Sequence, residues 1–281
     1  MRAQNFEAKV LSNAACAADI MLMDVQLPEG AKLPKAGQFY MLRAWAADEA
    51  PLLSRPISVF SCDKDARTVS FLYQVKGIGT KKLAELVSGD ALMLTGPAGN
   101  GFLLEGTTAV VVGGGIGTAP LYQLAKELKE AGVIVDAILG YRDEPYCVAQ
   151  FESVCRRVSV ATDTGSVGHK GFVTDLLIPE HYDTVYICGP EIMMEKAAKM
   201  ALEKGVRTYV SKEAKMACGV GACLGCTCKA KEGGVSVCKD APVFERSVFY
   251  RSHSFPAAHG LVPPDDENPG DRRFGHLRLR L

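Results

Sequence analysis

Five of the ten cysteines of this 281-residue chain lie close together, between Cys218 and Cys238. Four of them follow the spacing Cys218-x4-Cys223-x2-Cys226, with Cys238 after a gap. This is the plant-type spacing of a [2Fe–2S] cluster, which is held by four cysteine thiolates. Glycines alternate with these cysteines, and glycine lets the backbone turn closely around an inorganic core because it adopts positive φ without a Cβ clash. The spacing therefore predicts a one-electron carrier with Cys218, Cys223, Cys226 and Cys238 as the metal ligands.

Zinc and disulfides are alternative uses of the same cysteines. Zinc ribbons carry two C-x2-C pairs about 15–20 residues apart, whereas this run has a single such pair, so a zinc-stabilised binding module without redox activity is disfavoured. Disulfides form in oxidising compartments, and the N-terminal residues lack the apolar stretch of a signal peptide. Cys228 is left over. It follows Cys226 by two residues and is a possible substitute ligand.

The composition argues against a nucleic-acid-binding or membrane protein. Hydrophobic residues make up 48% of the chain, the formal net charge is +0 and the pI is about 6.9. Nucleic-acid binding usually needs a basic surface, and no apolar run approaches the ~20 residues that cross a bilayer. The other cysteines are scattered among apolar residues, which suits free thiols in a reducing compartment. We therefore expect a cytoplasmic protein with neither nucleic acid nor membrane as a partner.

Residues 1–100 predict an antiparallel β-barrel or sandwich. Short runs rich in β-branched and aromatic residues alternate with turn signals, which is typical of such folds. One helix is expected from about Thr80 to Val87, with Thr80 as its N-cap. The expected strands are Phe39–Leu42, Ile57–Phe60, Val69–Val75 and Ala91–Leu94.

Residues 101–210 predict an α/β domain built on a parallel sheet. The continuous apolar run Ala109–Val112 is typical of a buried parallel strand. A glycine-rich turn follows, and Thr118–Ala131 has the apolar periodicity of a helix. Strand-like segments then recur with helices between them, as in βαβ units. These segments are Val133–Leu139, Val158–Ala161 and Thr184–Cys188.

Two shorter parts complete the chain. Residues 211–246 contain the clustered cysteines and predict a small cluster arm. Residues 247–281 combine several prolines and both charge signs with few large apolar residues, so we expect a disordered tail.

The predicted cluster implies that the chain also has sites for a flavin and a nicotinamide. A cluster moves one electron at a time and a nicotinamide moves two as hydride, so a flavin is expected between them. One candidate nicotinamide turn consists of Gly113, Gly114, Gly115 and Gly117. Its backbone N–H groups can approach a phosphate at a helix N-terminus, although a tight connection alone needs similar glycines. Cys188, Gly189 and Pro190 end another strand, and ligands bind at the carboxyl ends of parallel strands.

A flavin site is predicted in the β-rich part. The segment Arg55-Pro56-Ile57-Ser58 combines a cation, a rigid turn and a hydroxyl. The guanidinium fork matches phosphate oxygens, so Arg55 suits a diphosphate. Gly79 and Thr80 are near the start of the expected helix and form a second phosphate candidate. Each segment taken alone is also what an ordinary surface turn contains.

These motifs follow one another in the order seen in the ferredoxin-reductase-like flavoproteins. The chain resembles that family in its succession of RPIS, LYQVKGIGT, GPAGNGF, VVVGGGIGTAP and CGPEIMM. The run MACGVGACLGCTCK followed by VCKDAPVF resembles one branch, the electron-transfer subunits of NAD-dependent dihydroorotate dehydrogenase. The resemblance extends from about Phe6 to Phe244.

The resemblance implies an FAD-binding barrel, a nicotinamide-binding α/β domain and a [2Fe–2S] arm. The implied partner is a separate FMN-containing catalytic subunit that oxidises dihydroorotate in pyrimidine biosynthesis, in a heterotetramer of two of each chain. The resemblance does not identify a catalytic acid or base in this chain. The implied FAD contacts are Arg55, Pro56, Ile57, Ser58, the backbone of Leu72, Tyr73 and Gln74, and Gly79 and Thr80. The implied nicotinamide contacts are Gly113 to Gly117 and Cys188 to Pro190.

Two departures from the branch and one rival remain. Ala241 stands where the branch usually has glycine, so the turn after Cys238 is expected to be distorted. The tail beyond Phe244 has no counterpart in the branch. The rival is a flavin and [2Fe–2S] subunit that links NAD(P)H to ferredoxin or sulfur. Some relatives of that kind replace one cluster cysteine by aspartate, so the presence of all four cysteines favours the dihydroorotate branch. Arg142 and Asp143 leave the choice between NADH and NADPH open, and the resemblance favours NADH.

Overall fold

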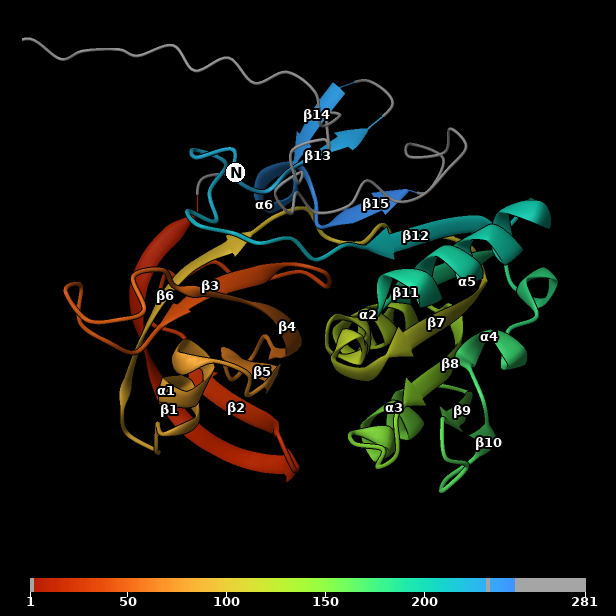
Figure 1. Ribbon diagram of the computed structural model, residues 1–281, viewed down its shortest axis with the longest axis horizontal. Helices are drawn as coiled ribbons and strands as arrows, with labels where there is room; N and C mark the ends of the chain where they lie inside the picture. Colours follow the sequence, from red (N-terminus) through yellow and green to blue (C-terminus); the bar gives the residue numbers. More distant parts are fainter. Residues whose placement is uncertain (1–2, 231–232, 246–281) are drawn as a thin grey trace, which may run out of the picture.

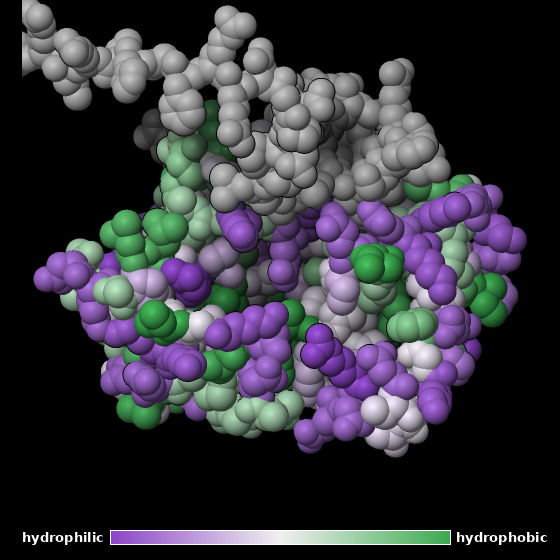
Figure 2. All heavy atoms as spheres, viewed as in Figure 1, coloured by the Kyte–Doolittle hydropathy of each residue, from purple (hydrophilic) through white to green (hydrophobic). Residues whose placement is uncertain are grey.

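The computed structural model describes residues 3–230 and 233–245 and consists of a barrel, an α/β domain and a small arm (Figure 1). The segment 247–281, for which we expect disorder, lies outside the described residues. No helix in the described ranges is long and apolar enough to cross a membrane. On the face shown in Figure 2, polar side chains spread over both large domains and surround scattered apolar ones.

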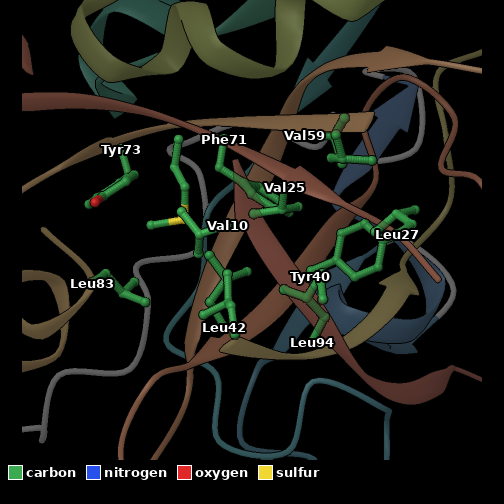
Figure 3. Close-up of a cluster of buried hydrophobic side chains, with 14 of the residues drawn as sticks. Val10, Val25, Leu27, Tyr40, Leu42, Val59, Phe71, Tyr73, Leu83 and Leu94 are labelled. Atoms are coloured by element: carbon green, nitrogen blue, oxygen red, sulfur yellow. The ribbon is translucent and has the colours of Figure 1, made fainter. Parts of the chain in front are cut away.

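The first domain is a closed antiparallel barrel, which confirms the predicted architecture. Its strands follow the order β1-β2-β5-β4-β3-β6, and the barrel closes because β1 pairs with both β2 and β6. Alternate residues of each strand point inward, so Val25, Tyr40 and Phe71 meet in one apolar core (Figure 3). The strands are β1 Gln4–Ala17, β2 Ile20–Gln26, β3 Phe39–Arg43, β4 Arg55–Asp63, β5 Thr68–Gln74 and β6 Ala91–Ala98.

One helix, α1 (Ile78–Ala84), follows β5 and inserts Leu83 into the barrel core. The predicted helix began at Thr80 with that residue as its N-cap, and this detail is wrong. The N-cap is Gly77, and Thr80 occupies the third helical position. Its hydroxyl oxygen accepts hydrogen bonds from the backbone N–H groups of Lys76 (2.9 Å) and Gly77 (3.1 Å). The threonine therefore caps the helix from within its first turn.

The second domain contains a seven-stranded sheet of order β10-β9-β8-β7-β11-β12-β15. All neighbouring pairs are parallel except β12 with β15, which confirms the expected parallel α/β sheet. The strands are β7 Thr108–Gly114, β8 Ile134–Tyr141, β9 Arg157–Thr162, β10 His169–Lys170, β11 Thr184–Cys188, β12 Arg207–Ser211 and β15 Val243–Glu245. β15 comes from the predicted arm, so the arm ends as an edge strand of this sheet.

Helices cover both faces of the sheet because its strands are apolar on both sides. α2 and α3 pack on one face, and α4 and α5 pack on the other. A 3-10 turn, Gly115–Thr118, precedes α2, so the single helix expected over Thr118–Ala131 begins one residue later. The helices are α2 Ala119–Glu130, α3 Val148–Val154, α4 Val173–Leu176 and α5 Glu191–Glu203, with a second 3-10 turn at Pro179–His181.

The barrel and the α/β domain are packed together directly. Phe60 of the barrel stacks on Tyr122 of α2 with ring centroids 4.7 Å apart. The backbone N–H of Cys62 donates to the side-chain oxygen of Gln123 at 2.8 Å. These contacts fix the carboxyl edge of the sheet relative to strands β4 and β5.

The arm comprises β13 (Thr227–Ala230), β14 (Gly233–Ser236) and α6 (Val237–Asp240). Its apolar residues pack on Phe39 and Met41 of the barrel and on Phe244 of β15. The arm therefore spans both domains, as Figure 1 shows.

The turn after Cys238 was expected to be distorted because Ala241 stands where the branch usually has glycine. Ala241 has φ −139° and ψ −156°, an extended conformation open to any residue, so the alanine at this position needs no distortion of the turn.

Candidate functional site

The four predicted ligand cysteines lie in a loop whose backbone N–H groups point at sulfur. The Sγ of Cys218 accepts hydrogen bonds from the N–H groups of Val220 and Cys223, both at 3.4 Å. The Sγ of Cys238 accepts from Gly221 at 3.1 Å. Two more bonds complete the set, from Gly225 to Cys223 at 3.5 Å and from Cys238 to Cys226 at 3.4 Å. All four sulfurs thus have the donors that a metal-bound thiolate needs.

Two glycines in the left-handed region of backbone conformation allow the loop to turn its N–H groups toward the sulfurs. Gly219 has φ +68° and Gly221 has φ +80°, and a Cβ on Gly219 would stand 2.3 Å from the Cγ of Met41. Glycine is therefore required at position 219 both for conformation and for space. The sequence predicts that glycines shape this loop. Gly219 does this by letting the loop lie directly on Met41 of the barrel strand β3.

The cysteines form two pairs, Cys218 with Cys223 and Cys226 with Cys238. Within residues 3–230 and 233–245, no three His, Cys, Asp or Glu side chains converge as ligands of one metal ion. A [2Fe–2S] core contains two irons that share four thiolates, whereas structural zinc needs all its ligands around one ion. Two pairs match the predicted core, in which two irons share four thiolates.

The two pairs differ in environment. Cys226 and Cys238 are 5% and 2% exposed, whereas Cys223 is exposed at the surface. Burial raises the pKa of Cys238 to about 12. Burial also acts to raise the pKa of Cys218, but the N–H groups of Val220 and Cys223 outweigh it and hold that pKa at about 6. One pair therefore faces the protein core and the other faces outward.

Cys228 occupies a different place from the four. It lies on β13 opposite Val235 and packs, half-buried, against the apolar core of the arm. Burial raises the pKa of its thiol. Its possible use as a substitute ligand stays a prediction to be tested.

The predicted flavin residues come together where β4, β5 and α1 meet. β4 pairs with β5, and α1 follows β5 directly. A Cβ on Gly79 would stand 2.9 Å from the Nε of Arg55, so glycine is needed for the arginine to lie against the helix. The Nη2 of Arg55 donates to the carbonyl of Leu53 at 2.6 Å, while its buried Nε has no hydrogen-bond partner among the described residues. A buried donor without a partner is uncommon, and a diphosphate oxygen would satisfy it.

The remaining flavin candidates fit the same surface. Leu72 and Tyr73 are 1% exposed, and the Tyr73 hydroxyl donates to Asn13 inside the barrel at 3.0 Å. The side chains of these two residues therefore point into the protein and cannot contact a ligand, and the implied backbone contacts of Leu72 and Tyr73 stay a prediction. The neighbouring predicted contacts Pro56, Ile57, Ser58, Gln74 and Thr80 are half-buried, so their surface is available.

The two predicted nicotinamide turns are adjacent at the carboxyl edge of the sheet. β7 and β11 pair in parallel with Gly113 opposite Cys188. A Cβ on Gly114 would stand 2.5 Å from the Sδ of Met193 and 2.8 Å from the Cδ of Pro190. Gly115 has φ +55° and open space beside it. The glycines thus allow the two turns to pack together and leave the backbone at Gly115 uncovered by other atoms.

Two residues near these sites did not stand out in the sequence. Met193, on α5, covers Gly114 and Gly189 with its thioether. Lys212 follows β12 and buries its side chain beside the arm. Neither belongs to a motif, and only the fold brings them to the site.

Comparisons with known proteins agree with this geometry. A family model described as the iron–sulfur cluster binding domain of dihydroorotate dehydrogenase B matches residues 213–248. The dihydroorotate dehydrogenase B (NAD+) electron transfer subunit of Clostridium acetobutylicum is 50% identical over 213 residues, which are 75% of this chain and 84% of that protein. The corresponding subunit of Clostridium perfringens is 43% identical over 249 residues, 87% of this chain and 97% of that protein.

Two solved structures share the fold. One is the structure of NADH-dependent reduced ferredoxin–NADP oxidoreductase, with a TM-score of 0.76 and 29% identity over 86% of this chain and 88% of that chain. The other is a ferredoxin NADP+ reductase from Neisseria gonorrhoeae with bound FAD and NADP, with a TM-score of 0.59 and 21% identity over 72% of this chain and 92% of that chain. The second likeness shows the fold alone.

Proposed function

The chain belongs to the family of electron transfer subunits of NAD+-dependent dihydroorotate dehydrogenase B, and we propose that it passes electrons between NAD(H) and a separate catalytic subunit. The proposed cofactors are FAD in the barrel and a [2Fe–2S] cluster in the arm. The observation that carries the proposal is the pairing of the four cysteines, with every sulfur accepting a backbone N–H. When bound, a flavin accepts hydride and releases single electrons, and a cluster carries one electron at a time.

The chain's own residues supply binding and orientation. Arg55 offers a buried N–H to the flavin diphosphate, and the half-buried stretch from Pro56 to Ser58 supplies surface for the ring system. Gly113 to Gly117 and Cys188 to Pro190 form the floor of the nicotinamide site at the sheet edge. No side chain of these segments needs to act as an acid or base, because hydride transfer moves no separate proton.

We propose NADH rather than NADPH as the nucleotide. Asp143 follows β8 at the carboxyl edge of the sheet, where the ribose of a dinucleotide binds in such folds. The Thr164 hydroxyl donates to its carboxylate at 2.7 Å, and this bond, with one from Ser166, lowers the pKa of Asp143. The ionised carboxylate opposes a 2′-phosphate, although the exposed Arg142 beside it would attract one.

The proposed partner is an FMN-containing catalytic subunit that oxidises dihydroorotate, in a complex of two of each chain in the cytoplasm. The outward-facing pair Cys218 and Cys223 supports docking of the partner at the arm, since electrons pass between groups that lie close together. None of the described cysteines forms a disulfide, which agrees with a reducing compartment. Light scattering of the purified complex gives its mass and tests the stoichiometry.

The decisive experiment compares three samples in one assay, orotate formation with NAD+ as acceptor. The isolated chain and the isolated partner should both be inactive, and the mixture should turn over. The isolated chain should still reduce an artificial acceptor with NADH, because that reaction needs only the flavin and nicotinamide sites. Orotate formation by the chain alone, or no gain on mixing, would contradict the proposal. Stimulation by ferredoxin in place of the partner would support the ferredoxin-linked rival instead.

A further inference from the structure

The loop between strands β3 and β4, residues 44–54, is held in place by the half-buried side chain of Arg43. All three nitrogens of its guanidinium group donate to backbone carbonyls of the loop. The Nε donates to Trp45 at 3.0 Å, the Nη1 to Leu52 at 2.7 Å and the Nη2 to Ala46 at 2.5 Å. Because the donors of a guanidinium form a rigid planar fork, Arg43 fixes three points of a segment that lies outside the helices and strands.

Trp45 anchors this arrangement to the barrel. Its side chain is 8% exposed and belongs to the apolar core of the barrel. The Cζ of Arg43 is 5.5 Å from the centroid of the Trp45 ring, a distance at which the face of an indole attracts a cation. The Nε1 of the indole donates to the carbonyl of Pro51 at 2.5 Å. The beginning and the end of the loop are therefore both tied to the barrel.

The loop in turn holds Arg55. The carbonyl of Leu53, the residue after Leu52, accepts a hydrogen bond from the Nη2 of Arg55 at 2.6 Å. The Nε of the same guanidinium is buried, has no hydrogen-bond partner among the described residues, and lies where a Cβ on Gly79 would stand 2.9 Å from it. Because the guanidinium is rigid, the position of the Leu53 carbonyl determines where the Nε–H of Arg55 points.

A second set of contacts connects the loop to α1. The backbone N–H of Glu49 donates at 3.2 Å to the carbonyl of Ala46, which also accepts the Nη2 of Arg43. The Glu49 carboxylate pairs with Lys82, which lies on α1 together with Gly79. Arg43 is thus connected to both segments next to Arg55, the loop and the helix.

We propose that Arg43 is a positioning residue for FAD, because it holds the loop whose Leu53 carbonyl orients Arg55 toward the diphosphate. Without Arg43 the loop loses three hydrogen bonds, and Arg55 is no longer held in one orientation. Binding of FAD then has to order this side chain, which weakens the affinity. The inference rests on the proposed function, because it requires FAD in the barrel.

The experiment is a double-mutant cycle on the full chain freed of flavin and titrated with FAD. Arg43→Met should raise the Kd for FAD about tenfold, a change within the range for residues of one hydrogen-bond network. In the Arg55→Ala background the same substitution should change the Kd by less than about twofold, because the side chain that Arg43 positions is gone. A merely structural role of Arg43 would instead weaken binding by the same factor in both backgrounds.

Arg67→Met is a matched control at the other end of β4. The Nη2 of Arg67 also holds a barrel loop, because it donates to the carbonyls of Pro28 (3.0 Å) and Ala31 (2.5 Å). We expect this variant to melt at a lower temperature than wild type and to bind FAD with an unchanged Kd. A loss of affinity in Arg67→Met equal to that in Arg43→Met would trace the effect to general destabilisation and overturn the inference.

The remaining outcomes separate the inference from the proposed function. An unchanged Kd in Arg43→Met, or an equal loss in both backgrounds, overturns the inference while FAD binding by wild type leaves the proposed function intact. If Arg43→Met does not fold, Arg43→Lys, which keeps the charge and loses the fork, is judged by the same two comparisons. A wild-type chain that does not bind FAD would overturn both.

Discussion

Gly117 lies directly against Gly189, so that a Cβ on Gly117 would stand 2.5 Å from the Gly189 Cα and 2.6 Å from its nitrogen. The first residue belongs to the turn after β7 and the second to the turn after β11. Gly189 adopts φ +155°, and a Cβ on it would stand 2.9 Å from the nitrogen of Gly114. The two turns of the proposed nicotinamide site therefore touch backbone to backbone, and there is no space for a side chain on Gly117 or Gly189.

Gly117→Ala should separate these turns and weaken NADH binding. The contact is with backbone rather than a flexible side chain, and overpacking of this kind costs about 1–3 kcal/mol. We expect the KM for NADH with an artificial acceptor to rise about tenfold, with FAD content unchanged. Gly205→Ala is the control, since Gly205 has φ +71° but no atom within 4 Å of a Cβ. It should lower stability modestly and leave the KM alone. A normal KM in Gly117→Ala would argue against this site.

Arg55→Ala should reduce FAD retention. The substitution removes a charge-assisted contact to the diphosphate, worth about 1.5–3 kcal/mol. Titration of the apoprotein with FAD gives the affinity. Arg55→Lys should fall between wild type and alanine, because it keeps the charge and loses the fork. If all three proteins bind FAD equally, Arg55 is an ordinary structural arginine held by Leu53.

Cys223→Ser should lose the cluster and keep the flavin. The exposed pair loses one of its two thiolates, while the barrel site lies in a separate domain. Iron content and flavin absorbance are measured on the same sample. Cys228→Ser is the control with equal chemistry and should retain iron. Iron lost from the Cys228 variant and kept in the Cys223 variant would show that the wrong four cysteines were chosen.

Much of this architecture was predictable because local signals and tertiary packing agree. Alternating apolar runs gave the barrel strands, and the strand Thr184–Cys188 has the same bounds in the sequence prediction and in the structure. Cysteine spacing indicated the cluster loop because ligand geometry limits where such residues can lie. The start of α1 was misplaced since threonine is a common N-cap, and its use inside the first turn depends on the preceding Gly77.

Contacts between distant segments could not be predicted from the sequence. The orphaned Nε of Arg55 depends on how α1 packs over β4, and that follows from closure of the whole barrel. Likewise, β15 joins the large sheet more than 30 residues after β12, without a periodic pattern of its own. The pairing of Cys218 with Cys223 depends on backbone turns at glycines rather than on spacing alone.

The last prediction concerns the stability of the α/β domain and its dependence on pH. Asp136, on β8, is 1% exposed and accepts hydrogen bonds from the Nε (2.9 Å) and Nη2 (2.7 Å) of Arg156. The Tyr182 hydroxyl donates to the same carboxylate at 2.9 Å. Burial acts to raise the pKa of Asp136, but Arg156 and Tyr182 outweigh it and lower that pKa.

Asp136→Asn should therefore destabilise the protein by about 1.5–3 kcal/mol at pH 7, the usual contribution of hydrogen bonds to a charged group. A carboxyl group with a lowered folded-state pKa stabilises the fold fully above its unfolded pKa of about 3.9, and this contribution disappears as the pH falls through the folded value. The difference between wild type and variant should thus be constant from pH 7 to 5 and shrink below pH ~4. Urea unfolding at each pH measures it, with the exposed Asp48→Asn as the control that changes little. A difference that persists undiminished in acid, or is absent at pH 7, would show that the ionised carboxylate does not stabilise the sheet.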